Sequence, residues 1–116
     1  MTPSPSPSSQ QPANEVQLTG RLAASPRRLT LPSGDELVSL RLVVDRPART
    51  RGTGSGPTVD TIDCSVWATG LARRVERWEP GDVVSLQGSL RRRFWRTPAG
   101  ARSRYDVEVA RARRLR

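Results

Sequence analysis

One run of residues places cations and an aromatic ring at strand spacing. Arg91, Arg93 and Trp95 occupy alternate positions in residues 82–96, and alternate side chains share one face of a β-strand. A guanidinium group can bind a phosphate, while an indole ring can stack on an unpaired nucleobase. The run therefore predicts a surface for a single strand of nucleic acid. The alternative is that Trp95 packs at the strand end and the arginines are only solvated.

Three more residues are candidates for this surface. Phe94 lies in the same run with the opposite parity, and packing at the strand end is its alternative role. Arg41 and Trp67 have outward parity in two other predicted strands, residues 36–46 and 59–67. For Trp67 the alternative is packing against a helix.

The segment 47–58, PARTRGTGSGPT, is a second cationic element. Its proline and glycine residues exclude regular structure, so we expect a flexible loop that carries Arg49 and Arg51. Such a loop can close over a nucleic-acid backbone after the strand has docked. The alternative is a solvated loop without a ligand.

The overall charge favours a polyanionic partner. All 20 basic residues of the 116-residue chain are Arg, and 11 acidic residues leave a net charge of +9. A small domain with this charge usually binds nucleic acid. A solvated surface produced by an arginine-rich composition is the alternative.

The sequence offers little for catalysis. It contains no His, and its single Cys64 cannot form an internal disulfide or a cysteine metal cluster. No glycine-rich phosphate loop opens a helix, and Asp106 and Glu108 alternate as solvent-facing residues do. We expect no enzyme activity, cofactor, metal site or small-molecule substrate. No apolar segment is long enough to cross a membrane and no secretory signal is visible, so we expect a cytoplasmic protein.

A small β-domain must position these residues. Alternating hydrophobicity predicts strands over residues 15–23, 36–46, 59–67, 82–96 and 104–113, and 27–31 could continue the first strand. Residues 69–78 have helical spacing, which makes Trp78 a core residue, and we interpret Tyr105 as structural too. An all-β, five-stranded OB-fold barrel with one capping helix between strands 3 and 4 fits this order. Gly20 and Gly88 provide the bends that closure requires.

Residues 1–13, rich in Pro and Ser, predict a disordered tail, so the OB-fold domain is expected over residues 14–116. From Asn14 to about Leu115 the sequence resembles bacterial single-stranded-DNA-binding proteins. The matching segments are NEVQLTGRLAASPR, LPSG, LVSLRLVVDR, CSVWATGLARRV, EPGDVVSLQGSLRRRFW and RSRYDVEV. The resemblance implies a nucleoid-associated homotetramer that binds single-stranded DNA without sequence preference in replication, recombination and repair. An RNA-binding or primosome-type OB protein, or an OB-fold protein-interaction subunit, is the alternative.

The resemblance assigns roles residue by residue. Trp95 and Trp67 fall on aromatic positions of the family, and Arg91 and Arg93 fall on its basic strand. Two further stacking positions of the family are occupied here by Ala48 and Thr61, and Asp63 stands where some members carry Arg. The chain ends in RARRLR, where the family has an acidic tail that recruits partners. These departures indicate a short accessory paralogue.

Overall fold

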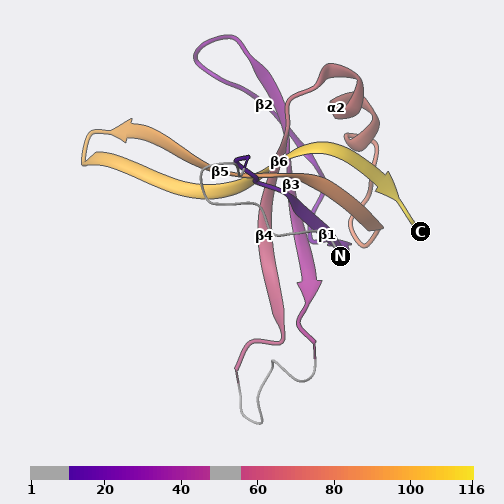
Figure 1. The fold of residues 1–116 in the computed structure, drawn as a ribbon. Coiled ribbons are helices and arrows are strands. Elements are labelled where there is room, and N and C mark those ends of the chain that lie inside the picture. The colour runs from indigo at the N-terminus through magenta and orange to yellow at the C-terminus, as the bar shows by residue number, and fades with distance from the viewer. Residues whose placement is uncertain (1–10, 48–55) are drawn as a thin grey trace.

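The computed structural model describes residues 11–47 and 56–116, which form six strands and one short helix (Figure 1). In chain order these are β1 (Val16–Leu22), β2 (Arg27–Thr30), β3 (Glu36–Asp45), β4 (Val59–Val66), α2 (Thr69–Val75), β5 (Val83–Thr97) and β6 (Gly100–Arg114). The loop residues Arg49 and Arg51, like most of the predicted tail, lie outside the described residues.

Five of the strands close into a ring. The sheet order is β1-β5-β6-β4-β3-β2, and β1 also pairs with β3 through Arg21↔Val43 and Leu22↔Leu42. The helix α2 stands between β4 and β5, the third and fourth strands of this ring in chain order. This confirms the predicted OB-fold barrel and the place of its helix.

The strand β2 refines the prediction for residues 27–31. The sequence allowed this segment to continue the first strand, but it forms a separate strand after the Ser25-Pro26 break and pairs antiparallel with β3. The intervening turn is closed by the Leu31 N–H, which donates to the Asp35 carbonyl at 2.8 Å. Gly34 has a φ of 90°, a conformation that glycine adopts at little cost.

Two glycines allow the strands to approach one another closely enough for closure. A Cβ atom on Gly20 would lie 2.3 Å from the Val43 carbonyl oxygen, and one on Gly88 would lie 2.0 Å from the Glu108 carbonyl oxygen. The ladder between β5 and β6 shifts register at Gln87/Gly88. Both sites fit the sequence prediction that interior glycines mark sharp bends in a small barrel.

The core lies inside the ring and under α2. Val38, Leu42 and Leu86 are fully buried there. The helix ends at Val75, three residues earlier than expected, because the chain turns: the Trp78 N–H donates to the Val75 carbonyl at 3.0 Å. Trp78 is nevertheless 9% exposed and belongs to the core cluster, as its spacing predicted.

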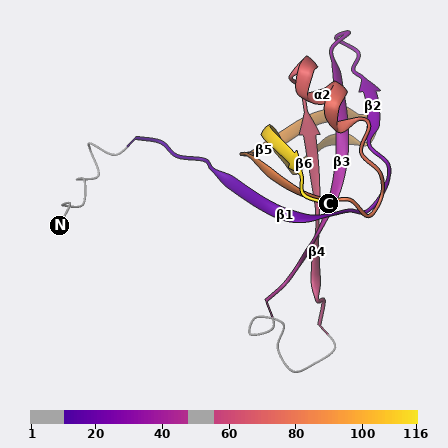
Figure 2. The same cartoon turned by 90° about the vertical axis from the view of Figure 1, so that its right-hand side faces the viewer.

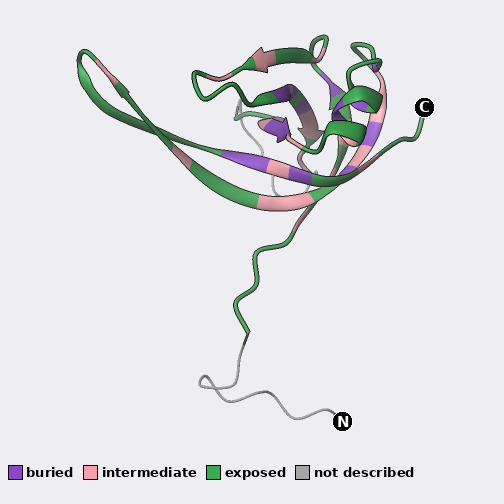
Figure 3. Ribbon diagram, turned by 90° about the horizontal axis from the view of Figure 1, so that it is seen from above, coloured by how far each residue is buried: buried purple, intermediate pink, exposed green. Residues whose placement is uncertain are grey.

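Two hairpins extend beyond the barrel. β3 and β4 run side by side from the barrel toward the loop that joins them (Figure 2). β5 and β6 continue together as a long two-stranded arm, whose outer half is largely exposed (Figure 3). β1 pairs with β5 only from Val83 to Gly88. Beyond Gly88, β5 is paired with β6 alone. A turn at Pro98-Ala99 closes it, with Gly100 at a φ of 127°.

Candidate nucleic-acid interface

The strand register gathers the predicted residues on one side of the barrel. Across β5 and β6, Arg93 lies opposite Arg104 and Trp95 lies opposite Arg102. The parallel pairing of β4 with β6 and the antiparallel pairing of β3 with β4 continue this side as far as Arg41. We call the outward side chains of β3, β4 and the β5–β6 arm, together with that of Trp67 just after β4, the outer wall. It contains the predicted residues Arg41, Trp67, Arg91, Arg93 and Trp95.

The outer wall is hollowed into a cleft of about 430 Å³ between β2, β3 and the β5–β6 arm. It is lined by Leu29, Leu31, Leu37, Ser39, Cys64, Ser65, Trp67, Arg93, Phe94, Trp95, Arg104 and Asp106. Leucines supply an apolar side, and the arm supplies rings and guanidinium groups. This combination suits a nucleobase with its attached phosphate.

Arg93 connects the rings and charges of the cleft. Its guanidinium carbon lies 5.0 Å from the centroid of the Trp67 ring, within the range of a cation–π interaction. Its Nε donates to Asp106 Oδ1 at 3.2 Å, and its Nη2 donates to Ser65 Oγ at 3.3 Å. Trp67 Nε1 also donates to Ser65 Oγ, at 3.2 Å. Arg93 therefore orients Trp67 along the cleft wall.

The aspartate beneath Arg93 corrects one sequence interpretation. Asp106 was expected to face solvent, but it is only 5% exposed. Arg93 covers it, and removal of that arginine would leave a buried carboxylate without its charged partner. Such a loss is costly because the carboxylate has already given up its hydration.

The outer wall also carries acidic residues that engage its arginines. Arg91 Nε donates to Glu108 Oε2 at 2.9 Å, and Arg41 Nε donates to Asp63 Oδ1 at 3.3 Å. Arg104 Nη1 lies 3.9 Å from Asp63 Oδ2. Exposed pairs of this kind stabilise a protein by about 0–1 kcal/mol each. A phosphate can therefore displace these carboxylates at little cost, but it must compete with them.

The aromatic residues of the arm are more exposed than residues that pack in a core. Trp95 is 44% exposed and Phe94 is 70% exposed, so neither is a packed strand end. Tyr105 has the parity of the core residues Val107 and Val109, yet it is 58% exposed. Its structural interpretation was wrong, because the arm runs beyond the barrel and the inward side of its strands has no core there.

Arg102 and Arg104 are the residues of this wall that sequence reasoning missed. The sequence feature that could have identified them is the two-residue turn at Pro98-Ala99. That turn pairs Thr97 with Gly100 and thereby places Arg102 beside Trp95. A hairpin register fixed by its turn extends over the whole arm.

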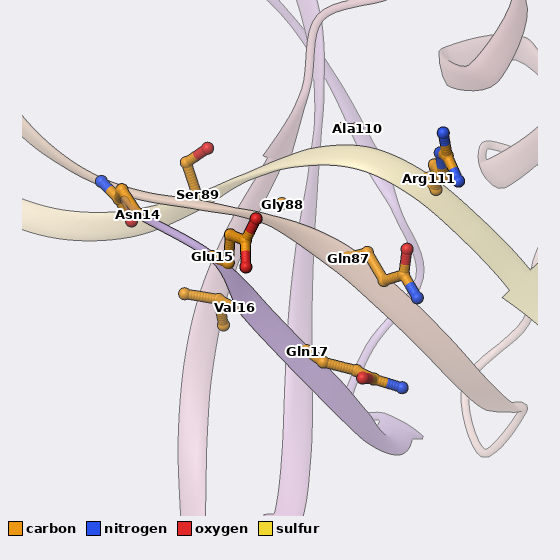
Figure 4. A pocket seen from close by; sticks show the side chains of 9 residues that line it. All are labelled: Asn14, Glu15, Val16, Gln17, Gln87, Gly88, Ser89, Ala110 and Arg111. Carbon is orange, nitrogen blue, oxygen red and sulfur yellow. The ribbon is translucent and has the colours of Figure 1, made fainter. Parts of the chain in front are cut away.

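A larger hollow of about 580 Å³ lies elsewhere on the outside of the barrel, over β1, β5 and β6 (Figure 4). Its lining includes Glu15, Gln17, Gln87 and Arg111 but no aromatic residue. The side chains of Gln17 and Gln87 extend along neighbouring strands in Figure 4. This polar surface lacks rings for stacking, so the cleft on the outer wall is the better candidate site.

Other chemistry has little support in the described ranges, 11–47 and 56–116. No group of three or more potential ligands there could hold a metal ion. No helix among these residues is long and apolar enough to cross a membrane. Burial, with the negative charges of Asp106 and Asp63, raises the pKa of the Cys64 thiol to about 12, so this thiol is a poor nucleophile at neutral pH.

Comparison with known proteins agrees with this architecture. The Plasmodium falciparum SSB complex with ssDNA is a similar solved structure, with a TM-score of 0.73 and 20% sequence identity. The match covers 92% of this chain and 98% of that chain, and it shows that the two share a fold. Residues 13–115 match the Single-strand binding protein family. This protein therefore belongs to the single-strand binding protein family.

Proposed function

We propose that this protein binds single-stranded DNA without sequence preference and without catalysis or a cofactor. The observation that carries the proposal is the cleft in which Arg93, Trp67 and Trp95 meet. Stacking is open to any unpaired base, because every base has a π-face, and guanidinium groups follow the phosphates. The family to which the chain belongs, and the DNA strand bound to the similar Plasmodium protein, support the same function.

The polar groups of the cleft also favour tolerance of sequence. The Ser65 hydroxyl already accepts from Trp67 and Arg93, and the Asp106 carboxylate accepts from Arg93. These groups are engaged within the protein and are poorly placed to read base edges. Specific readout requires free donors and acceptors at base edges.

We also propose that the protein acts where single-stranded DNA arises, in replication, recombination and repair on the nucleoid within the cytoplasm. Its role there is to cover an exposed strand. An accessory paralogue beside a main replication protein fits the replacement of two family stacking positions by Ala48 and Thr61.

A homotetramer is our proposal for the assembled state. One edge of β1 pairs with β5 from Val16 to Arg21, whereas the other edge pairs with β3 only at Arg21 and Leu22. Among the described residues, the rest of that edge is unpaired, and an open edge is a template for another strand. Light scattering at micromolar concentrations should give a mass above that of a monomer, and a monomer throughout would contradict the proposal.

A titration of labelled oligo(dT), oligo(rU) and duplex DNA at two salt concentrations tests the function. We expect oligo(dT) to bind well above duplex, with an affinity that falls steeply as salt increases. Equal affinity for single and double strands at matched salt would reduce the protein to a generic polycation. A clear preference for oligo(rU) would favour the RNA-binding alternative.

A further inference from the structure

The inward side of the β5–β6 arm carries aromatic residues that no core covers. Leu90 is 45% exposed, Phe94 70% and Tyr105 58%. They share a side of the arm because Tyr105 lies opposite Arg92, and Leu90, Arg92 and Phe94 alternate along β5. We call Arg92, Phe94 and Tyr105 the inner face of the arm. Trp95 points to the opposite side, on the outer wall.

The inner face is arranged around one guanidinium group. The Arg92 guanidinium carbon lies 5.0 Å from the Phe94 ring centroid and 5.5 Å from the Tyr105 ring centroid. Its Nη2 donates to Ser103 Oγ at 3.1 Å. Among the described residues no carboxylate lies within 4.0 Å of Arg92, unlike Arg91 and Arg93 on the other side. Arg92 is therefore held beside two rings with its charge available to an anion.

The charge of the arm indicates which kind of ligand contacts these rings. Residues 91–105 contain six arginines and no acidic residue. A second copy of the same arm would bring like charges together, and the cores of protein interfaces are depleted in charge. A polyanion with flat apolar groups matches both the charge and the rings, and single-stranded nucleic acid has both features.

We propose that the inner face is a second stacking platform for the DNA strand that occupies the cleft. Bases stack on Phe94 and Tyr105, and Arg92 contacts a phosphate. The strand leaves the cleft at Trp95 and passes around the arm, whose two sides are separated by the thickness of one sheet. This inference rests on the proposed function and assigns a binding role to Tyr105 and Arg92, which the sequence did not identify.

The arm offers a short path between its two sides. Phe94 and Trp95 are adjacent in the chain and face opposite sides, and Phe94 also borders the cleft. Arg96 and Arg102 lie near the tip, where the strand would pass. A short oligonucleotide fills the cleft alone, whereas a longer one reaches both platforms.

The test compares two lengths of oligo(dT), of about 6 and about 16 nucleotides, which lie toward the ends of the range of OB-fold site sizes. The variant is Tyr105→Leu, which leaves every residue that lines the cleft in place, and the matched control is Tyr105→Phe, which keeps the ring. We expect Tyr105→Leu to bind the longer oligonucleotide about tenfold more weakly. Its affinity for the shorter one should be unchanged, and the control should match the unmodified protein at both lengths.

Several results would overturn the inference. Unchanged affinity for the longer oligonucleotide would do so, and an equal loss at both lengths would show that the rings belong to the cleft instead. A changed mass in light scattering with normal DNA binding would assign the inner face to protein contact. If oligo(dT) binds the unmodified protein no better than duplex DNA, it is the proposed function that fails.

A second measurement does not depend on the variant folding. An oligonucleotide that carries 5-iodouracil is photocrosslinked to the unmodified protein, and the modified peptides are identified by mass spectrometry. We expect adducts at Tyr105 with the longer oligonucleotide only, beside those at Trp95 with both lengths. Adducts confined to the outer wall at both lengths would contradict the proposal.

Discussion

At the scale of single residues, Arg93 has two roles that can be separated. It offers charge to a phosphate, and it also covers Asp106 and orients Trp67. Arg93→Ala should therefore weaken oligo(dT) binding and also lower the free energy of unfolding, by about 1–3 kcal/mol, because a buried carboxylate loses its partner. Thermal melting and a salt titration of affinity measure the two effects.

Arg91→Ala is the matched control for Arg93→Ala. Its partner Glu108 has a side chain that is 37% exposed, whereas that of Asp106 is 6% exposed. We expect Arg91→Ala to flatten the dependence of log affinity on log salt concentration, by a slope of about 0.7 for one lost phosphate contact. The stability of the fold should remain nearly unchanged. If the two variants melt at the same temperature, Arg93 has no structural role.

At this scale, strand parity predicted which of the candidate residues share a side. It placed Arg41, Arg91, Arg93 and Trp95 on one outward side, and the structure gathers them there. It could not show that acidic residues engage these arginines, because pairing depends on which strands become neighbours. It also led us to interpret Tyr105 as structural, since parity gives the side of a strand but not where the core ends.

At the scale of elements, barrel closure depends on the glycine in β5. Gly88→Ala would bring a Cβ atom within 2.0 Å of the Glu108 carbonyl oxygen, so the backbone must move. We expect a loss of several kcal/mol of stability, at the upper end of what overpacking costs. Gly70→Ala in α2 is the control, because nothing lies within 4 Å of its added Cβ. It should stabilise the helix by about 0.5–1 kcal/mol, and urea unfolding measures both.

A different outcome would revise this account of closure. If Gly88→Ala unfolds at the same urea concentration as the unmodified protein, the close approach of β5 and β6 is not a requirement of the fold. If Gly70→Ala is equally destabilising, the effect reflects a general intolerance of alanine and not the site.

The elements themselves were largely predictable. Alternating hydrophobicity located each strand of the barrel, and the change of period located α2. The separate strand β2 was not predicted, because four residues with one partly buried leucine give too little pattern. The sequence also did not predict that the β5–β6 arm projects beyond the barrel. Apolar residues alternate along the arm just as they do along strands that face the core.

At the scale of the whole molecule, the acidic residues of the outer wall should limit affinity. Asp63 lies near both Arg41 and Arg104, so Asp63→Asn releases two arginines toward a ligand. We expect the affinity for oligo(dT) to rise by up to about fivefold at low salt, the equivalent of about 1 kcal/mol, and the gain to shrink at high salt. Fluorescence titration at two salt concentrations measures this change.

Asp35→Asn is the control of equal charge, because Asp35 borders a different hollow beside Gly34 and Thr69. It should raise affinity less than Asp63→Asn does. Equal gains from the two substitutions would mean that only the net charge matters and that the ion pairs of the outer wall do not compete with DNA.

Fold and family could be inferred from the sequence because many short segments agree in order and spacing, from the NEVQLTGRLAASPR opening to RSRYDVEV. The assembled state has no such signal: an unpaired β1 edge permits a tetramer but does not specify one. The net charge of the sequence likewise indicated a polyanionic ligand. Which acidic residues lie beside the arginines of the outer wall could be seen only from the arrangement of the strands.

The most direct test of the central claim compares single-stranded and duplex DNA for the unmodified protein, Trp95→Ala and Trp78→Ala at matched salt. Trp95→Ala should lose about tenfold in oligo(dT) affinity, since stacking contributes about 1–3 kcal/mol per base. It should keep its duplex affinity and its melting temperature. Trp78→Ala should melt early, because it leaves a cavity under α2. If Trp95→Ala binds oligo(dT) normally, or melts early, the outer wall does not hold DNA by stacking and the account fails.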